Sequence, residues 1–439
     1  MSGPRVVVIG GGIAGLCVAY YLAQRDAEVV VIEAKEVGSG ASFANGGWIT
    51  PAQAGPLPEP GLTIYGLRAL MSADSALYFK PSYLPTLAPW LARFWTYCNQ
   101  RDFERGTDAL AALGGRAFDL VDGMVADGVE FELYKLGMLC ATANEREARD
   151  VLERLEPMRR LGFEIPNDLV VGDELHALEP ALSERVKAGF AIAEHWHVRS
   201  STMTEGLARS LRAKGVTIVE SAPVRAFDLV PGRVRAVRTD AGEWQGDAFV
   251  LAAGSWTTKL AHLLDLTLPM QPGKGYTFMI RPKVMPRHGI LFADIHAGAT
   301  PFGDRVRIGG TMEFSGFDRS VDTRRISTIF KLARDYIELE QPDYEEPWAG
   351  LRPMVADGLP ILDRAGPYRN AYLATGYSML GMTVGPPAGQ AMAEMVLTGE
   401  RPAIFEPFRL DRFKPWLRRG ASSGARSNGA QGTRAPAQS

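Results

Sequence analysis

Three glycines near the N-terminus have a spacing that could bind a dinucleotide. Gly10, Gly12 and Gly15 follow the apolar run of residues 6–9 in the pattern G-x-G-x-x-G. In this pattern the first glycine permits a tight turn, the second lets backbone amides approach a pyrophosphate, and the third allows a helix to pack closely on a strand. The N-terminus of that helix adds a partial positive charge. The spacing therefore predicts a strand, a turn and a helix that bind a pyrophosphate.

An acidic residue, Glu33, ends the next predicted strand, residues 28–33. A carboxylate at this position can accept hydrogen bonds from a ribose diol, whereas an arginine would favour a 2′-phosphate. The strand, the glycine spacing, the helix and the acid together favour a dinucleotide site over a glycine-rich turn in an ordinary βαβ unit. Both NAD and FAD are bound by this pattern, so these residues leave the choice between them open.

A second glycine-rich segment, residues 38–48, follows that strand. It is too rich in glycine for a helix and could bring backbone amides and the Ser42 hydroxyl against another phosphate or a ring system. The alternative is a flexible surface connection. On composition alone the alternative is the more common outcome.

The composition is that of a soluble globular protein with a sizeable core. The chain has 439 residues, of which 46% are hydrophobic and 22% charged, and its formal net charge is -2. Its length predicts two or three domains. The balance of 48 basic and 50 acidic side chains argues against a nucleic-acid-binding protein. The cysteines at 17, 98 and 140 form no close pair, which favours a reducing compartment such as the cytoplasm.

Residues 6–23 form an uncharged run that is long enough to cross a membrane. The glycines within it would each cost a helix about 1 kcal/mol relative to alanine. No cleavage pattern of small residues follows the run. We therefore expect a strand, a turn and a helix here, and neither a membrane span nor a secretion signal.

The chain resembles the D-amino-acid oxidase superfamily of FAD-dependent oxidoreductases, and within it the bacterial D-amino-acid dehydrogenase small subunits. The resemblance is carried by VVVIGGGIAGLCVAYYLA at 6–23, ASFANGG at 41–47, GLRPMVADGLPI at 350–361 and ATGYSMLGMT at 374–383. It extends over most of the chain and is weakest from about 50 to 200. It implies an α/β fold in which a Rossmann-like FAD-binding domain of the glutathione-reductase type is interleaved with an α+β substrate domain on a mostly antiparallel sheet.

The domain boundaries follow from this resemblance and from composition. The FAD-binding domain is predicted at residues 1–55, 200–262 and 346–415, the substrate domain at 56–199 and 263–345, and a disordered tail at 418–439. Apolar spacing predicts helices at 86–99, 107–127 and 145–161, and buried strands at 215–220 and 248–253. Within the first of these helices, Trp90, Phe94 and Trp95 are expected to be core residues.

The resemblance also assigns residues to the cofactor. We expect FAD to be bound by Gly10, Gly12, Ile13, Ala14, Gly15, Glu33, Ala34, Ser42, Asn45, Gly46, Gly47, Val224, Ala253, Gly254, Trp256, Gly376, Leu380, Gly381, Met382 and Thr383. A helix beginning near Pro386 and Pro387 could stabilise negative charge on the reduced flavin. No cysteine follows Cys140, so the cysteinyl-flavin link of the related monomeric sarcosine oxidases has no candidate, and noncovalent FAD is expected.

Four residues are candidates for the reaction itself. By type alone Arg352 would be a surface arginine, but the family uses the matching arginine to bind the substrate carboxylate, and a guanidinium offers two parallel donors for it. Tyr276 aligns with a family stretch that faces the flavin and could donate a second hydrogen bond, although a half-buried sheet tyrosine is nearly as common. His296 and Tyr377 are weaker candidates, and Tyr377 stands where the dehydrogenases commonly carry histidine.

Other catalytic classes find little support. His195 and His197 are the only close histidine pair and lack carboxylates around them apart from Glu194, so no metal site is expected. No G-x-S-x-G elbow follows a strand, as a hydrolase of that type would require.

The resemblance implies oxidative deamination of a small amino acid, most simply a D-amino acid, including cyclic substrates of the D-proline type. Hydride would pass from the substrate Cα to flavin N5, and the imino acid would hydrolyse to a keto acid. A quinone-linked chain and oxygen are both candidate acceptors, and a peripheral contact with the inner membrane, a partner subunit or a homo-oligomer is left open. The alternatives are a glycine, sarcosine or opine oxidase of the same superfamily, and a nicotinamide-binding or non-catalytic dinucleotide-binding protein.

Overall fold

The N-terminal motif lies in a mostly parallel sheet. A computed structural model describes residues 3–62, 66, 76–340 and 342–414. The first sheet has the strand order β10-β2-β1-β14-β21-β20, with β1 at Arg5–Ile9, β2 at Glu28–Ile32, β10 at Thr217–Val219, β14 at Ala248–Leu251, β20 at Ile361–Arg364 and β21 at Ala371–Thr375. Only β20, at the edge, is antiparallel to its neighbour. Residues 6–9 and 29–32 are all buried, as β-branched strands covered on both faces should be. The strands predicted from the sequence are therefore confirmed.

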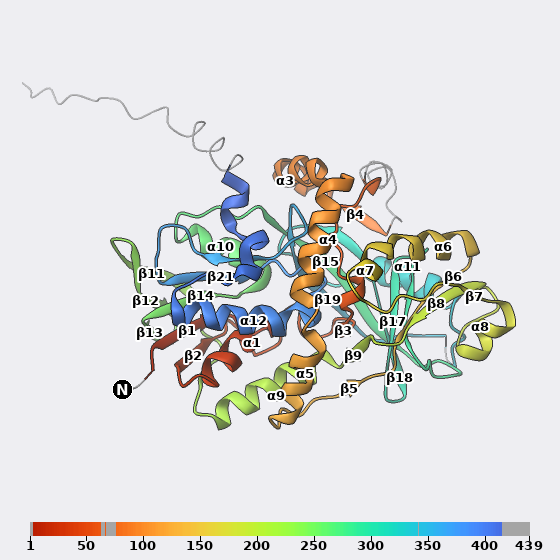
Figure 1. Cartoon of the computed structure of the whole chain (residues 1–439), viewed down its shortest axis with the longest axis horizontal. Coiled ribbons are helices and arrows are strands. Elements are labelled where there is room, and N and C mark those ends of the chain that lie inside the picture. Colours follow the sequence, from red (N-terminus) through yellow and green to blue (C-terminus); the bar gives the residue numbers. More distant parts are fainter. Residues whose placement is uncertain (1–2, 63–65, 67–75, 341, 415–439) are drawn as a thin grey trace, which may run out of the picture.

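Helices cover one face of this sheet, and a small antiparallel sheet covers the other (Figure 1). The helical layer consists of α1 (Ile13–Ala23), α9 (Ser200–Ala213) and α12 (Gly381–Thr398), and the small sheet consists of β11 (Val224–Val230), β12 (Arg233–Thr239) and β13 (Gly242–Gln245). Val6 and Val8 pack into the helical layer, and Val7 and Ile9 pack toward the small sheet. Successive residues of a strand point to opposite faces, so β1 supplies both cores.

A second sheet contains nine strands within the described residues. Its order is β19-β15-β18-β17-β16-β6-β8-β7, with β4 paired to β18. The strands are β4 (Leu77–Phe79), β6 (Met138–Thr142), β7 (Val170–Val171), β8 (Ala188–Ile192), β15 (Met270–Ile280), β16 (Gly289–Phe292), β17 (Ala297–Phe302), β18 (Arg305–Phe314) and β19 (Glu345–Val355). Most neighbours are antiparallel, and α11 (Thr323–Ala333) and α8 (Gly172–Leu178) share a core with one face. The expected antiparallel substrate sheet is confirmed.

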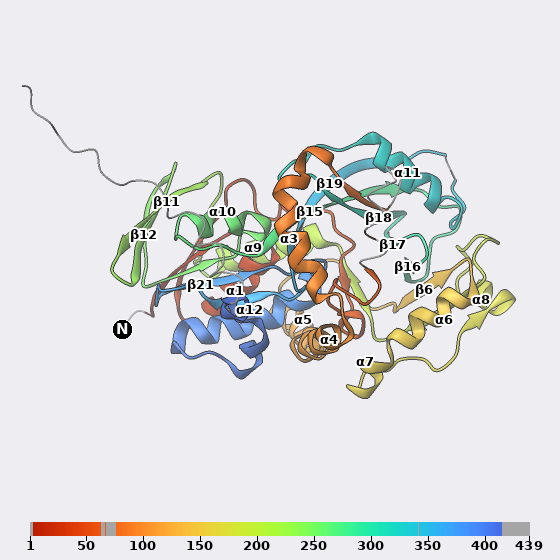
Figure 2. The same ribbon diagram turned by 90° about the horizontal axis from the view of Figure 1, so that it is seen from above.

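The chain crosses between the two sheets several times. A third, small sheet of β3 (Trp48–Ile49), β9 (Trp196–Val198) and β5 (Leu133–Tyr134) brings together three distant segments. Figure 2 shows the two large sheets on opposite sides of α3 and α4. One boundary differs from the expectation. Residues 346–355 were assigned to the FAD-binding domain, but they lie in β19, which pairs with β15 in the second sheet.

The helices between residues 84 and 160 differ from the predicted ones in their ends and breaks, although α3 has the predicted length of 14 residues. They are α3 (Leu84–Tyr97), α4 (Gln100–Gly114), α5 (Ala117–Ala126), α6 (Glu145–Arg154) and α7 (Glu156–Arg160), and a further short helix, α10, covers Thr257–His262. The predicted helix 107–127 is divided between α4 and α5. Gly114 and Gly115 lie at the break, where their low helix propensity favours an end, and Arg116 leaves the helical region.

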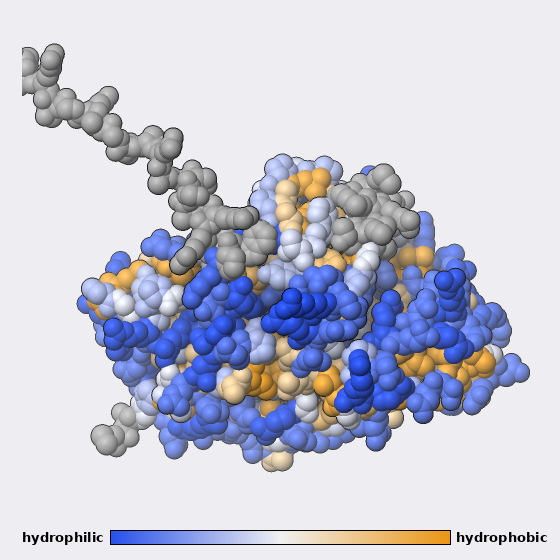
Figure 3. All heavy atoms as spheres, turned by 45° about the horizontal axis from the view of Figure 1, so that its top comes forward, coloured by the Kyte–Doolittle hydropathy of each residue, from blue (hydrophilic) through white to orange (hydrophobic). Residues whose placement is uncertain are grey.

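The described helices include none that is both long enough and apolar enough to span a membrane. On the face that Figure 3 shows, hydrophilic residues cover most of the surface. The predicted tail, 418–439, lies outside the described residues.

Candidate active site

The glycine motif forms a turn in which side chains have no room. Gly10 has a φ of 119°, and a Cβ on it would lie 2.5 Å from the carbonyl oxygen of Ala252. A Cβ on Gly15 would overlap the carbonyl oxygen of Gly10, so α1 can approach β1 only with glycine there. Both glycines thus have the steric roles expected from the motif.

Backbone amides at the start of α1 are available to a ligand. The amide of Gly11 donates to Oε2 of Glu33 at 2.7 Å, and the amide of Ile13 donates to Oγ of Ser42 at 3.0 Å. The amides of Gly12 and Ala14 have no partner within the described part of the chain. The first amides of a helix lack intrahelical acceptors and carry its partial positive charge, so this end of α1 favours an anion.

The loop between residues 38 and 48 is held in a defined shape. Oδ1 of Asn45 accepts a hydrogen bond from the amide of Gly47 at 2.8 Å, and Nδ2 of Asn45 donates to the carbonyl of Ala41 at 3.0 Å. Gly47 has a φ of 72°, and a Cβ on it would overlap the carbonyl oxygen of Val198 in β9. The loop is therefore fixed against β9, and the predicted ligand loop has a rigid backbone.

The segment that follows β14 also borders the site. Gly254 has a φ of 53°, and its carbonyl accepts a hydrogen bond from Oγ1 of Thr375 at 3.0 Å. The Trp256 ring lies 6.0 Å from that of Phe317, and the Arg319 guanidinium lies 5.9 Å from the Trp256 ring. This contact joins the first sheet to the loop after β18.

The helix that follows β21 begins earlier than the sequence predicts. We expected it near Pro386, but α12 starts at Gly381, and both prolines lie inside it. The lost proline amides are tolerated because the helix packs tightly on α1: a Cβ on Gly389 would lie 2.6 Å from the Cβ of Cys17. The N-terminus of α12 thus lies at the end of the loop that starts at Gly376.

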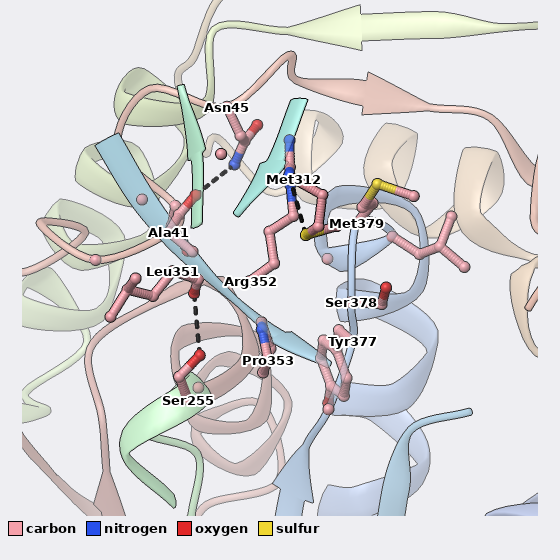
Figure 4. A pocket seen from close by; sticks show the side chains of 18 of the residues that line it. Ala41, Asn45, Ser255, Met312, Leu351, Arg352, Pro353, Tyr377, Ser378 and Met379 are labelled. Carbon is pink, nitrogen blue, oxygen red and sulfur yellow. Dashed lines mark hydrogen bonds between the residues drawn. The ribbon is translucent and has the colours of Figure 1, made fainter. Parts of the chain in front are cut away.

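Arg352 carries an unpaired charge in this site (Figure 4). Its Nη1 donates to the carbonyl of Thr311 at 2.7 Å and lies 3.6 Å from Sδ of Met312. Any Cβ on Gly275 would overlap the guanidinium, so only glycine at this position leaves room for the Arg352 side chain. No carboxylate among the described residues pairs with it, and burial lowers the pKa of Arg352 to about 10. The charge is therefore available to an anionic ligand.

The other three catalytic candidates differ in placement. Tyr276 points to the opposite face of β15, where its hydroxyl donates to Glu313 at 2.6 Å and burial raises its pKa. Tyr377 borders the site, but its hydroxyl is buried without a hydrogen-bond partner among the described residues, and burial raises its pKa. His296 borders the site with a φ of 51°. The predicted hydrogen bond from Tyr276 to a substrate carboxylate is therefore not available in this arrangement.

These elements enclose one large cavity, of about 1360 Å³. The predicted site residues that line it are Gly10, Gly12, Ile13, Ala14, Glu33, Ala34, Ser42, Asn45, Gly46, Gly47, Val224, Ala253, Gly254, Trp256, Gly376, Leu380, Gly381, Met382, Arg352, Tyr377 and His296. Gly15, Tyr276 and Thr383 do not line it. The Thr383 hydroxyl instead joins α12 to β3, accepting from the Thr50 amide at 3.0 Å and donating to the Trp48 carbonyl at 3.2 Å.

The sequence analysis missed part of the cavity lining. Trp90, Phe94 and Trp95 were expected to be core residues only, but all three also line the cavity. Trp48 lines it too, and its indole nitrogen donates to Thr300 at 2.8 Å. Trp48 directly follows Gly46 and Gly47 of the predicted ligand loop, and this position could have indicated that it lines the cavity. The α3 residues gave none, because an amphipathic helix has the same spacing whether its apolar face meets a core or a ligand.

The histidine pair is embedded in the protein. His195 and His197 are both fully buried at β9, and burial lowers their pKa values to about 3 and about 4. The described residues hold no group of three or more histidine, cysteine or acidic side chains that could bind a metal ion.

Known proteins resemble the chain over almost its whole length. A D-amino acid dehydrogenase from Rhizorhabdus wittichii is 30% identical over 412 residues, which cover 91% of this chain and 97% of the relative. The solved structure of glycine oxidase from Bacillus cereus matches with a TM-score of 0.68 at 24% identity, covering 93% of this chain and 98% of that one. L-proline dehydrogenase from P. horikoshii matches with a TM-score of 0.71 at 19% identity, covering 94% and 98%. At these identities the two structures show the fold.

The family comparison agrees with the motifs and the cavity. Residues 5–395 match the family DAO, described as FAD dependent oxidoreductase. The match confirms the resemblance that the glycine motif and the two late segments predicted, and it decides against a nicotinamide-binding or non-catalytic protein. The chain belongs to the DAO family of FAD-dependent oxidoreductases.

Proposed function

We propose that the protein oxidises D-amino acids and that Arg352 binds the substrate carboxylate. The observation that carries the proposal is a half-buried guanidinium with no acidic partner among the described residues, in a cavity that the dinucleotide motif also lines. A buried charge is costly unless a partner compensates it, so an anionic ligand stabilises this arrangement. The printed name of the R. wittichii relative, D-amino acid dehydrogenase, supports the choice of substrate.

The residues along the cavity fit an FAD held without a covalent bond. Glu33 would bind the ribose diol, and the amides of Gly12 and Ala14 would bind the pyrophosphate. The loop of Asn45 to Gly47 and the N-terminus of α12 line the same cavity as Arg352. None of the three cysteines lines the cavity. The cofactor would thus be bound by backbone groups and by one carboxylate.

The chain's own contribution to the reaction is to bind and orient the substrate. Bound FAD would take a hydride from the substrate Cα, and the imino acid would hydrolyse to a keto acid. Two parallel donors of Arg352 would bind the carboxylate, while the Thr311 carbonyl fixes the guanidinium. Partial shielding of the guanidinium from water would strengthen the ionic contact. Neither Tyr276 nor a metal is part of this proposal.

The visible spectrum of the FAD-loaded protein, recorded without oxygen, tests the proposal. We expect D-alanine, D-leucine or D-proline to bleach the flavin band and their L-enantiomers to leave it unchanged. Bleaching by glycine, sarcosine or an opine alone would instead support the alternative oxidase activity. A flavin band that no amino acid bleaches would contradict both.

The electron acceptor and the assembly remain predictions. Adding oxygen or a soluble quinone to the reduced protein, and following the return of the flavin band, distinguishes the two acceptors. Sedimentation with and without lipid vesicles tests for a partner copy and for the predicted peripheral membrane contact.

A further inference from the structure

Beside Arg352 the cavity has an apolar lining supplied by three elements. We define the apolar wall as Leu77 and Phe79 of β4, Met312 and Phe314 of β18, and Trp90, Leu91 and Phe94 of α3; all seven residues line the cavity. These side chains are distant in sequence, and two of the three elements lie in the region where the family resemblance is weakest. The apolar wall is therefore assembled from segments that only the fold brings together.

The register of two strands turns four of these side chains to the cavity. β4 pairs with β18 in parallel, with Leu77 opposite Met312 and Phe79 opposite Phe314. The residue between them on β18, Glu313, points to the other face, where it accepts the hydrogen bond from Tyr276. Because neighbouring strand residues alternate between faces, the cavity face of this strand pair is wholly apolar.

Helix α3 completes the apolar wall with aromatic rings. The Phe314 ring lies 5.6 Å from that of Phe79 and 5.3 Å from that of Trp90, and Trp90 lies 5.1 Å from Phe94. The indole nitrogen of Trp90 donates to the carbonyl of Pro269 at 3.1 Å. Its one polar group is thus satisfied away from the cavity, and the rings present carbon to a ligand.

The apolar wall lies directly beside the Arg352 guanidinium. Sδ of Met312 lies 3.6 Å from Nη1 of Arg352, and a Cβ on Gly273 would lie 2.5 Å from the same sulfur. Gly273 and Gly275 therefore leave room on β15 for Met312 and Arg352 to lie side by side. A ligand whose carboxylate contacts Arg352 would have its side chain against Met312 and the aromatic rings behind it.

We infer that the substrate is an amino acid with a bulky apolar side chain, of the leucine or phenylalanine class. The inference rests on the proposed function and replaces the small amino acid predicted from the sequence with a larger apolar one. Apolar side chains gain by leaving water for such a surface, whereas a second carboxylate or an amide would lose its hydration there. One to a few extra carbons in a fitted apolar pocket change kcat/KM by about 10-fold to 100-fold.

Steady-state kinetics of the FAD-loaded enzyme test the inference with D-alanine, D-leucine, D-phenylalanine and D-glutamate. We expect kcat/KM for D-leucine or D-phenylalanine to exceed that for D-alanine by at least about 10-fold and D-glutamate to be the poorest. Leu77→Asn, which places an amide on the apolar wall, should reduce the D-leucine to D-alanine ratio by about 10-fold. Phe94→Leu, which removes an aromatic ring from the α3 part of the apolar wall, should reduce the preference for D-phenylalanine. D-alanine or D-glutamate as the best substrate would overturn the inference.

A matched control and a binding experiment separate this inference from the proposed function. Leu263→Asn, at an exposed position after α10 outside the cavity, should leave the substrate ratios unchanged. Isothermal titration of the FAD-loaded protein with acetate, butyrate, phenylacetate and succinate needs no turnover. We expect the Kd to fall by at least about 10-fold from acetate to phenylacetate, with Leu77→Asn flattening the series. A flat series, or tightest binding of succinate, overturns the inference. A graded series without oxidation of any amino acid would uphold the apolar pocket and reject the proposed function.

Discussion

Arg352 is the residue on which the proposed chemistry depends most. Replacing it with methionine keeps much of the side-chain volume but removes the charge and both donors. Two charge-assisted hydrogen bonds of about 1.5–3 kcal/mol each would be lost, so we expect KM to rise at least about 100-fold. Arg352→Lys should restore part of the binding, because it keeps the charge but not the parallel donors. Steady-state kinetics with D-leucine measure both variants, with Arg281→Met as control, since Arg281 is half-exposed, pairs with Asp304 and Glu345, and does not line the cavity. An unchanged KM in Arg352→Met would place the carboxylate elsewhere.

Thr311 fixes the guanidinium from a strained conformation. It is β-branched but has a φ of 61°, its hydroxyl is buried without a partner among the described residues, and its carbonyl accepts the hydrogen bond from Arg352. Glycine adopts this φ without strain and keeps the carbonyl, so we expect Thr311→Gly to raise the free energy of unfolding by about 1 kcal/mol and to leave KM within about 2-fold.

The control for that prediction is Thr217→Gly. Thr217 is exposed and lies in an ordinary strand, so glycine should lower the free energy of unfolding there by about 0.5–1 kcal/mol. Urea unfolding measures both variants. Destabilisation of equal size in the two would show that Thr311 is not strained.

Residue types with a fixed steric or electrostatic role could be located from the sequence. The motif singled out Gly10 and Glu33 and the resemblance singled out Arg352, and all three line the cavity, because each proposed role requires that one residue type. Tyr276 and Thr383 could not be placed, since a tyrosine or threonine satisfies its hydroxyl equally well on either side of a backbone. A one-residue bulge in β18 near Thr311 also shifts the register between β18 and β15, and no local sequence pattern predicts it.

At the scale of elements, strands were easier to predict than helix ends. The buried runs of β1 and β2 consist of β-branched residues and are bounded by turns, so their pattern predicts strands and no other element. The start of α12 was missed because Pro386 and Pro387 signal a first turn, while contact with α1 extends the helix before them. Tertiary packing therefore overrode the local signal.

The contact between α1 and α12 can be tested with a pair of helix glycines. A Cβ on Gly389 would meet both the side chain and the backbone of Cys17, at 2.6 and 2.8 Å, so the helices would have to separate. A Cβ on Gly123 in α5 would meet nothing within 4 Å. We expect Gly389→Ala to lower the free energy of unfolding by about 1–3 kcal/mol, and Gly123→Ala to raise it by about 0.5–1 kcal/mol.

Urea unfolding measures these two variants, and FAD titration adds a second readout. Both α1 and α12 begin at the cavity, so separating them should also weaken FAD binding in Gly389→Ala. Equal stability of the two variants would contradict the close packing.

At the scale of the whole molecule, the site is built where the two sheets meet. The first sheet supplies the dinucleotide motif and Gly376, and the second supplies Arg352 and Gly275. The boundary drawn at residue 346 missed this division, because β19 belongs to the second sheet although the chain that follows it returns to the first. Neither sheet alone supplies both the dinucleotide motif and Arg352, so binding of FAD and binding of substrate both depend on how the two sheets pack together.

Two buried histidines lie in or next to the small sheet of β3, β9 and β5, and they make the stability of the fold depend on pH. His197 lies in β9, which pairs with both β3 and β5, and His195 directly precedes β9; burial holds their pKa values near 4 and 3, respectively, against an ordinary 6.5. Both are neutral in the folded protein, whereas the unfolded chain takes up protons below pH 6.5. The free energy of unfolding is therefore highest above pH 6.5 and falls as the pH is lowered toward about 4, by roughly 2 kcal/mol per histidine at pH 5.

Urea unfolding between pH 8 and pH 4.5 measures this loss. His195→Leu combined with His197→Phe, which keeps a ring against Tyr134, should flatten the pH dependence over this range. His262→Gln, an exposed histidine in α10, should leave the dependence as it is in the wild type. If the double variant loses as much stability between pH 8 and pH 4.5 as the wild type does, carboxylates alone cause the acid sensitivity. The two histidines would then make no contribution to it.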